Sequence, residues 1–369
     1  EMMTPAEREL RVELSGRIED DGIRLLAHEG WLTQHGQFSA SAGDQPPWRM
    51  DRFYRHVRKD SGILMQDGKP EGGKYSFDAA NRKPWNGEPK APQPVRFTPD
   101  AVTLEVGELV ETAFADHPGR LDLSTLPATA DDAGRLWRHA LEHCMEQFGP
   151  YEDAMSARSG GLFHTRIAPL LNLHRLLPRQ VVDDVLDGGF PLESTEGFVR
   201  QVLGWREFVR HVHQETDGFR TLPFDLEGGH RLPATYWGEA PSGLHCLDHV
   251  VEQVWDEGWT HHIPRLMVLA NIASLLDVSP RELSDWFWVA YTDAWDWVVE
   301  PNVIAMGSCG GGDLMTTKPY VSGAGYIHRM ADFCDDCPFD PKKNGPLTPM
   351  YWAYLARHED TLQDHRRMK

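Results

Sequence analysis

Two cysteines separated by two residues, Cys334 and Cys337, follow directly after an apolar-patterned segment. Thiolates at this spacing can form half of a zinc site, part of an iron–sulfur cluster or a redox dithiol, and they can also be inert buried thiols. The chain has no second C-x-x-C pair, so further metal ligands must come from elsewhere. Cys246, in GLHCLDH, is the distant partner that we expect. For this pair alone, inert thiols and a metal site are equally good interpretations.

Two adjacent histidines, His261 and His262, stand in THHIPRL. Neighbouring side chains point to different sides of a helix, and a helical zinc pair needs the spacing i, i+4, so the sequence does not predict a chelating pair. One interpretation is a structural histidine beside an exposed one. The other is a single histidine that donates a proton near neutral pH, where its titration range suits that role.

Four tryptophans occur within 12 residues of DWFWVAYTDAWDWVV: Trp286, Trp288, Trp295 and Trp297. Core packing is the commoner role of such residues. The functional alternative is a chain of oxidisable indoles that delivers electrons to a buried redox cofactor. The Gly-rich GSCGGGDLMTTKPYVSGAGY lacks the spacing of a P-loop before Lys318, and it is either a flexible loop or backbone that lines a cofactor.

The elements that position these residues are mostly helices. Residues 7–20 are predicted as an amphipathic helix and residues 22–33 as a short strand, which together look like the last αβ piece of an α/β unit. Residues 66–100 are rich in Gly, Pro, Asn and Lys and predict a connector. From about residue 130 nearly every segment has helical periodicity. The helical segments are RMDRFYRHVRKDSG, FVRQVLGWREFVRHV, HHIPRLMVLANIASLL and PRELSDWFWVAYTDAWDWV.

Composition limits the class of protein. The 369 residues carry a formal net charge of −19, which taken alone argues against a nucleic-acid partner, although it says nothing about one local Arg-rich cleft. Lysine is absent over long stretches, and together with the acidity this suggests a halophilic source. Five cysteines do not make a disulfide scaffold, so we expect a reducing cytoplasm. No stretch approaches 18 uncharged apolar residues, so no membrane span is expected.

Taken together, these residues resemble the iron–sulfur branch of the photolyase/cryptochrome family, the prokaryotic (6-4) photolyases. The resemblance runs from about residue 5 to residue 358. The stretches that carry it are RMDRFYRHVRKDSGILMQDGKPEGGKYSFDAANRKP, GFVRQVLGWREFVR, THHIPRLMVLAN, DAWDWVVEPNVIAMG, TKPYVSGAGYIHRMADFCDDC and YWAYLARHE.

The resemblance implies a mainly α protein with a U-shaped FAD in a C-terminal helical domain. An α/β, Rossmann-like antenna domain precedes it in such proteins and carries a lumazine chromophore. Only a remnant of that domain is expected in residues 1–45, so no antenna chromophore is expected. Residues 46–130 are expected to be a helical and extended connector, and residues 131–369 the FAD-binding catalytic domain.

The resemblance also assigns roles to individual residues. The expected catalytic residues are His262 as proton donor, His261 before it, Tyr320 facing the lesion, and Trp286 and Trp237 in electron transfer. The expected FAD contacts are His164, Thr165 and Arg166 in LFHTRIAPLLN, the ion pair of Arg265 with Asp293, and Asn302. The expected ligands of a [4Fe-4S] cluster are Cys246, Cys334 and Cys337.

The sequence departs from the family pattern at several positions. Phe287 stands where relatives carry a redox tyrosine after Trp286, and Val299 stands where a glutamate is usual. Gly345 replaces the fourth cluster cysteine, so the remaining ligand is unassigned. The nearest oxygen or nitrogen candidates are Asp335, Asp336 and His245.

The function that this resemblance implies is light-driven repair of (6-4) photoproducts in UV-damaged DNA by a monomeric enzyme. One alternative is a cryptochrome-type photoreceptor with the same fold and FAD but without repair, which the altered electron chain favours. The other is a non-photochemical helical binding module with a structural zinc, for which a colourless purified protein would be the evidence.

Overall fold

The computed structural model describes residues 9–10, 13–15, 28–220, 228–308, 310–316 and 319–362. Within these ranges the protein is built of helices, and the one regular sheet is a hairpin of two short antiparallel strands, β1 (Met65–Gln66) and β2 (Lys69–Pro70). In the first half of the chain the α-helices are α2 (His35–Ala42), α3 (Met50–Ser61), α4 (Ala101–Ala113), α5 (Ala130–His143), α6 (Met145–Phe148), α7 (Ala168–Asn172), α8 (Pro178–Asp187), α9 (Leu192–Val199) and α10 (Glu207–Glu215). In the second half they are α11 (His245–Glu257), α12 (Asn271–Leu275), α13 (Pro280–Ala290), α14 (Asp296–Glu300), α15 (Gly325–Met330), α16 (Leu347–Arg357) and α17 (Glu359–Leu362).

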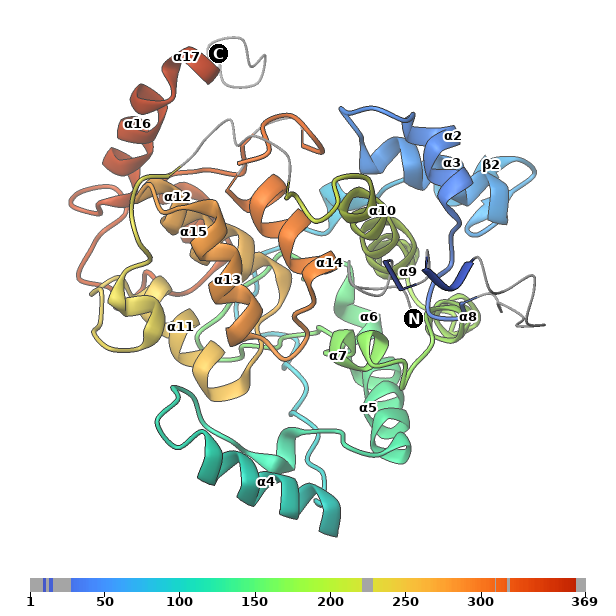
Figure 1. Cartoon of the computed structure of the whole chain (residues 1–369), viewed down its shortest axis with the longest axis horizontal. Coiled ribbons are helices and arrows are strands. Elements are labelled where there is room, and N and C mark those ends of the chain that lie inside the picture. Colours follow the sequence, from blue (N-terminus) through green and yellow to red (C-terminus); the bar gives the residue numbers. More distant parts are fainter. Residues whose placement is uncertain are drawn as a thin grey trace.

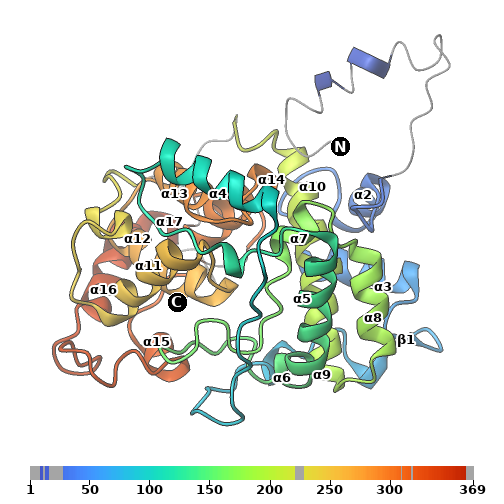
Figure 2. The ribbon, with the colours of Figure 1, turned by 90° about the horizontal axis from the view of Figure 1, so that it is seen from below.

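The helices form two groups that lie side by side. One contains α2, α3 and α5 to α10, and the other contains α11 to α13 and α15 to α17 (Figures 1 and 2). Each group encloses its own cluster of buried apolar side chains, the first centred on residues such as Phe53 and Phe208 and the second on Val250 and Trp286. Helix α14 packs against α10 and α13, so it connects the two groups.

The N-terminal αβ piece can be checked only in part. Most of the predicted helix 7–20 and the first residues of the predicted strand 22–33 lie outside the described residues. Residues 28–33 form turns and irregular backbone, so the strand prediction is wrong over that part. Buried Thr33 instead donates its backbone and hydroxyl hydrogens to the Glu207 carboxylate, at 3.0 and 2.7 Å, which fixes this segment to α10.

Helix α3 confirms the prediction of an amphipathic helix. Met50, Phe53, Tyr54 and Val57 all lie on its buried face, as their spacing requires. The helix ends at Gly62, whose φ of +75° is the left-handed conformation that glycine adopts without steric cost.

The segment 192–215 is one helical run in which α9 and α10 flank a π-helical stretch, Arg200–Arg206. Its apolar stripe is buried as predicted, but the opposite side is buried as well. Arg200 lies 3.2 Å from Glu152 and 3.4 Å from Glu196, so the buried charges are paired. Pairing is what makes such burial tolerable.

The Trp-rich segment differs from its prediction as a single helix. Helix α13 stops at Ala290, because Tyr291 is extended and its hydroxyl pairs with the Thr260 hydroxyl at 2.9 Å. The chain then turns and resumes as α14 at Asp296. Two further π-helical stretches, Pro264–Ala270 and Pro301–Gly307, contain Arg265 and Asn302. Such stretches are frequent at functional sites.

No helix among the described residues is both long and apolar enough to cross a membrane.

Candidate functional site

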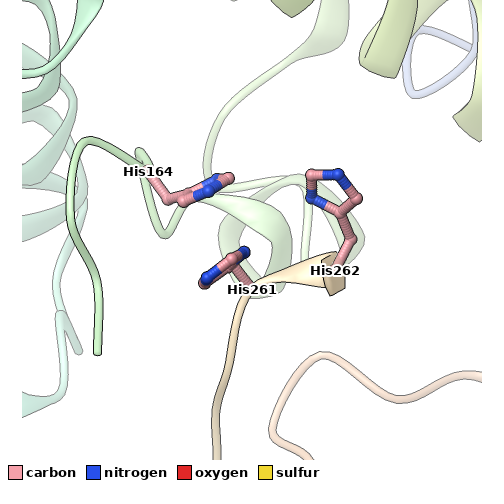
Figure 3. Close-up of side chains that lie close together, drawn as sticks. All are labelled: His164, His261 and His262. Carbon is pink, nitrogen blue, oxygen red and sulfur yellow. The ribbon is translucent and has the colours of Figure 1, made fainter. Parts of the chain in front are cut away.

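Three histidines from two distant segments meet at one place (Figure 3). The ring of His164 stacks on that of His261, with centroids 4.1 Å apart and planes 16° apart. His262 lies edge-on to His164 at 5.6 Å. One potential ligand nitrogen from each ring lies within 4.8 Å of the other two. The helical-spacing argument against joint action of His261 and His262 fails, because His261 precedes the helix and only His262 lies in it.

Burial separates the roles of the three rings. His261 is 4% exposed, whereas the His262 side chain is 42% exposed. Burial holds the pKa values of His164 and His261 well below the usual 6.5, so both are neutral at pH 7. The accessible ring that can exchange protons with a ligand is therefore that of His262.

Asp153 lies behind His262, with its Oδ1 3.8 Å from the His262 Nε2. The Tyr326 hydroxyl donates to Oδ2 of the same carboxylate at 3.1 Å. Burial raises the pKa of Asp153, but the interactions with His262, Arg82 and Tyr326 outweigh it, so that pKa is lowered. The Asp153 carboxylate is therefore ionised at neutral pH and faces the His262 ring.

Arg265 and Asp293 form a bidentate ion pair, with N–O distances of 2.9 and 2.8 Å. The Arg265 Nε also donates to the Thr260 carbonyl at 2.9 Å, and the guanidinium lies 4.0 Å from the centre of the Tyr291 ring. Burial lowers the pKa of Arg265, and Asp293 more than compensates, so that pKa is raised. The structure therefore contains the ion pair expected from the resemblance, and its place beside a flavin stays a prediction.

Asn302 donates its side-chain amide to the Val298 carbonyl at 2.7 Å. A second asparagine, Asn172 at the end of α7, donates to the Asp293 carbonyl at 2.9 Å and so links α7 to the ion pair. The sequence prediction did not include Asn172. It lies in the quoted LFHTRIAPLLN stretch, but only the fold shows that it contacts Asp293.

The predicted phosphate-binding turn lines a cavity of about 360 Å³. Its cationic lining comes from Lys90, Arg158 and Arg166, with Thr165 and the glycines 160 and 161 beside them. Arg166, at a φ of +57°, pairs with Glu257 and lies 4.3 Å from the Trp259 ring centre. Arg158 pairs with Asp332 at 2.9 Å and Arg166 with Glu257, so two of the three cations already have a carboxylate partner. Basic side chains and glycine backbone still suit an anionic group, so the lining is compatible with the phosphates of FAD. His164 lines the same cavity and also stacks against His261, and its expected role as a phosphate ligand stays a prediction.

Four aromatic rings form a continuous series beside the Arg265–Asp293 pair. Tyr291 lies 6.1 Å from Trp286, Trp286 lies 6.2 Å from Trp255, and Trp255 lies 6.1 Å from Trp237. Trp286 is 1% exposed, whereas Trp255 and Trp237 are half-buried. Sequence reasoning identified Trp286 and Trp237 but missed Trp255 and Tyr291, because contacts between segments distant in sequence leave no local pattern.

The three predicted cluster cysteines are neighbours. The pKa of Cys246 is raised to about 12, chiefly by burial and then by the thiols of Cys334 and Cys337. Gly345 closes a tight turn by donating to the Asp340 carbonyl at 2.8 Å, and a Cβ on Gly345 would lie 3.0 Å from that oxygen. The three thiols fit a cluster, and position 345 supplies no ligand.

The structure says less about the other predicted site residues. Asp336 and His245 line one cavity of about 630 Å³ beside α11. Tyr320 is half-buried and follows residues 317–318, which lie outside the described part of the chain, as does Cys309.

Comparison with known proteins agrees with this geometry. The family model described as deoxyribodipyrimidine photo-lyase-related protein matches residues 1–125, and the FAD binding domain of DNA photolyase matches residues 198–330. A (6-4) photolyase from Agrobacterium fabrum is 32% identical over 375 residues, covering 99% of this chain and 74% of the relative.

A solved bacterial class III photolyase from Agrobacterium tumefaciens superimposes with a TM-score of 0.61 at 14% identity, over 98% of this chain and 78% of that one, which shows a shared fold. An uncharacterised protein of Acanthamoeba polyphaga mimivirus is 38% identical over 113 residues, or 29% of this chain and 85% of that protein. The chain therefore belongs to the photolyase/cryptochrome family, in the branch of the bacterial (6-4) photolyases, and is a photolyase-type lyase with a FAD-binding domain.

Proposed function

We propose that this protein repairs (6-4) pyrimidine photoproducts in UV-damaged DNA and that His262 donates a proton to the lesion. The observation that carries the proposal is the position of His262, an accessible imidazole that lies edge-on to the neutral rings of His164 and His261 and has the Asp153 carboxylate beside it. A general acid must reach its substrate and be protonated at the working pH. Exposure provides the first condition, and the Asp153 carboxylate is the charged group that faces the ring.

FAD, when bound, would supply a light-excited electron to the lesion and take it back once the bases are restored, so that repair needs no net reductant. We assign its phosphates to the cationic cavity lined by Thr165 and Arg166. The Arg265–Asp293 pair and Asn302 are assigned to its ring system, where a fixed ion pair keeps the local charge constant.

The damaged base has to leave the duplex to reach His262. Flipping a base costs a few kcal/mol, and less at a lesion that is already badly paired. The net charge of −19 does not favour binding to the phosphate backbone, so we expect shape and stacking to carry much of the affinity. Tyr320 is the predicted aromatic contact to the lesion.

We assign the supply of electrons to the series Trp237, Trp255, Trp286 and Tyr291. With FAD bound, these rings would carry electrons inward from an external thiol reductant, which would deliver them at half-buried Trp237. Ring centres about 6 Å apart keep each step short. Tyr291 stacks on Phe287 with ring centres 5.2 Å apart, and we assign to it the role of the tyrosine that is missing at position 287.

The three cysteines are assigned to a [4Fe-4S] cluster. Such clusters usually take four thiolates, and this chain offers three neighbouring ones. The fourth ligand is then a non-cysteine group, with Asp335, Asp336 and His245 as the candidates.

The test compares His262→Ala with His56→Ala, a histidine on α3, on an oligonucleotide that carries one (6-4) photoproduct. Both variants should retain the flavin spectrum. Light-driven repair should fall by roughly 10²–10⁴-fold in His262→Ala, the range for loss of a general acid, and stay unchanged in His56→Ala. Repair that survives in His262→Ala contradicts the proton-donor role. A wild-type protein that binds flavin and repairs nothing favours a photoreceptor.

A further inference from the structure

The cluster of His164, His261 and His262 has the composition of a metal site (Figure 3). Neutral imidazole is a preferred ligand of zinc and its neighbours in the transition series, and three such ligands with a water molecule make a complete tetrahedral site. We propose that these three histidines bind a divalent transition-metal ion of the zinc type.

Two of the required lone pairs are already present and unused. The Nε2 of His164 and the Nδ1 of His261 are buried and have no hydrogen-bond partner. His164 forms a hydrogen bond with the backbone of Glu152, and because its Nε2 has no partner, that bond uses Nδ1. A ring N–H that donates to the backbone leaves the lone pair on the other nitrogen, which is the arrangement of most metal-bound histidines.

Charge favours the same conclusion. Metal binding normally competes with protonation of the imidazole. Burial keeps the pKa values of His164 and His261 well below 6.5, so neither has a proton to lose at neutral pH. Glu257 pairs with Arg166, so this cation near the rings is already partly neutralised.

His262 completes the site from the solvent side. The His262 Nε2 faces Asp153 Oδ1 at 3.8 Å, which leaves Nδ1 for the ion. The Asp153 carboxylate can then orient the His262 ring, as carboxylates commonly do for metal-bound histidines. The rings of His164 and His261 are nearly parallel with centres 4.1 Å apart, so their lone pairs lie in parallel planes and one ring must turn before both can point at one ion. A tetrahedral zinc site with bonds of about 2.0–2.1 Å needs nitrogens roughly 3.3 Å apart, so the exposed His262 ring has to move inward by roughly 1–2 Å.

The consequence for repair rests on the proposed function. An ion bound to His262 occupies the nitrogen lone pair that would otherwise hold the donated proton, so zinc inhibits repair and a chelator restores it. The binding itself requires neither light nor DNA and can be tested separately.

The experiment titrates flavin-loaded protein with Zn²⁺ against a competing chelator, in the dark. Co²⁺ then replaces Zn²⁺ as a spectroscopic probe, because thiolate ligands add near-ultraviolet charge-transfer bands that imidazoles lack. The variants are His262→Ala, His164→Ala and Asp153→Asn. His143→Ala is the matched control, since His139 and His143 form a separate i, i+4 pair on α5 with ring centres 4.6 Å apart. Cys334→Ala controls for binding by the thiols.

We expect one zinc site in the wild type that has no thiolate bands with Co²⁺. His262→Ala and His164→Ala should each weaken it by more than about 100-fold, and Asp153→Asn by about 10-fold, as for loss of a group that orients a ligand. His143→Ala and Cys334→Ala should leave it intact. Undiminished affinity in both His262→Ala and His164→Ala, or loss of the site in Cys334→Ala, overturns the proposal. His262 is partly exposed, so its variant should fold, which the flavin spectrum checks.

Discussion

Trp255 and Trp286 donate their indole N–H groups to the same acceptor, the backbone carbonyl oxygen of Tyr236, at 2.9 and 3.0 Å. The shared acceptor fixes the two rings edge to face at 6.2 Å, although they come from different helices, α11 and α13. Trp255 therefore lies between buried Trp286 and half-buried Trp237, and it provides the link that the sequence did not reveal.

Replacing Trp255 with phenylalanine should slow photoreduction of bound FAD by roughly tenfold or more, about 1.4 kcal/mol in barrier, because a benzene ring is much harder to oxidise than an indole. The measurement is the rate of flavin reduction under blue light with an external thiol. Trp288→Phe is the control, since Trp288 is 53% exposed. Equal rates in wild type and Trp255→Phe would show that electrons reach Trp286 by another route.

The charge of Asp153 should set the pH range of repair. The lowered pKa of Asp153 means that it is ionised throughout neutral pH. In Asp153→Asn a neutral amide replaces the carboxylate that lies 3.8 Å from the His262 Nε2, so the pH profile of repair should differ from that of the wild type. Tyr326→Phe removes the 3.1 Å hydrogen bond but keeps the charge, and its pH profile should stay close to that of the wild type. Identical profiles for Asp153→Asn and the wild type would rule out the electrostatic role.

The buried histidines should make the protein sensitive to mild acid. Burial, followed by the charges of Arg210 and His35, lowers the pKa of His211 well below 6.5, the unfolded value. Below pH 6.5, His211 binds a proton in the unfolded chain but not in the folded protein. The free energy of unfolding therefore falls as the pH decreases from 6.5 towards the lowered pKa of His211. The expected slope is roughly 1.4 kcal/mol per pH unit for each such histidine.

The measurement for this prediction is the free energy of unfolding by urea between pH 7.5 and 5. His211→Gln should flatten the dependence, because glutamine does not titrate. His117→Gln is the control, since His117 is exposed and is not among the groups that shift the pKa of His211. A slope that His211→Gln leaves unchanged would assign the acid sensitivity to other groups.

The buried charges of the 192–215 helical run should matter more than surface ones. Removing Arg200 leaves Glu152 and Glu196, which are 2% and 0% exposed, without their cation. Arg200→Leu should therefore cost about 3–5 kcal/mol of stability. Arg179→Leu removes an exposed i, i+4 pair with Asp183 and should cost less than about 1 kcal/mol. Urea unfolding of both variants tests the contrast, and similar losses in the two would contradict it.

Local patterns predicted the elements well where one face is apolar, as in α3, whose buried residues follow directly from their spacing. Local patterns failed where contacts between distant segments determine the end of a helix or the burial of a side chain. The break after Ala290 depends on the hydroxyl contact between Tyr291 and Thr260, and the burial of Arg200 depends on Glu152, which is 48 residues away. The same holds for the site. The sequence identified His261 and His262, but only the fold places His164 against them.

The assignment of Cys246, Cys334 and Cys337 to an iron–sulfur cluster can be tested through the iron content of the protein. Burial and mutual repulsion raise the pKa of Cys246 to about 12 and also raise that of Cys334, so without a metal these thiols are protonated and inert. A cluster reverses this, because metal-bound cysteine is deprotonated. Anaerobically purified protein should contain about four irons per chain and absorb broadly near 400 nm beyond the flavin. Cys334→Ala should lose both signals, whereas Cys144→Ala, a thiol buried beside the His164 carbonyl, should keep them. Iron well below one per chain, with a normally folded Cys334→Ala variant, would show that the three thiols are only packed against one another.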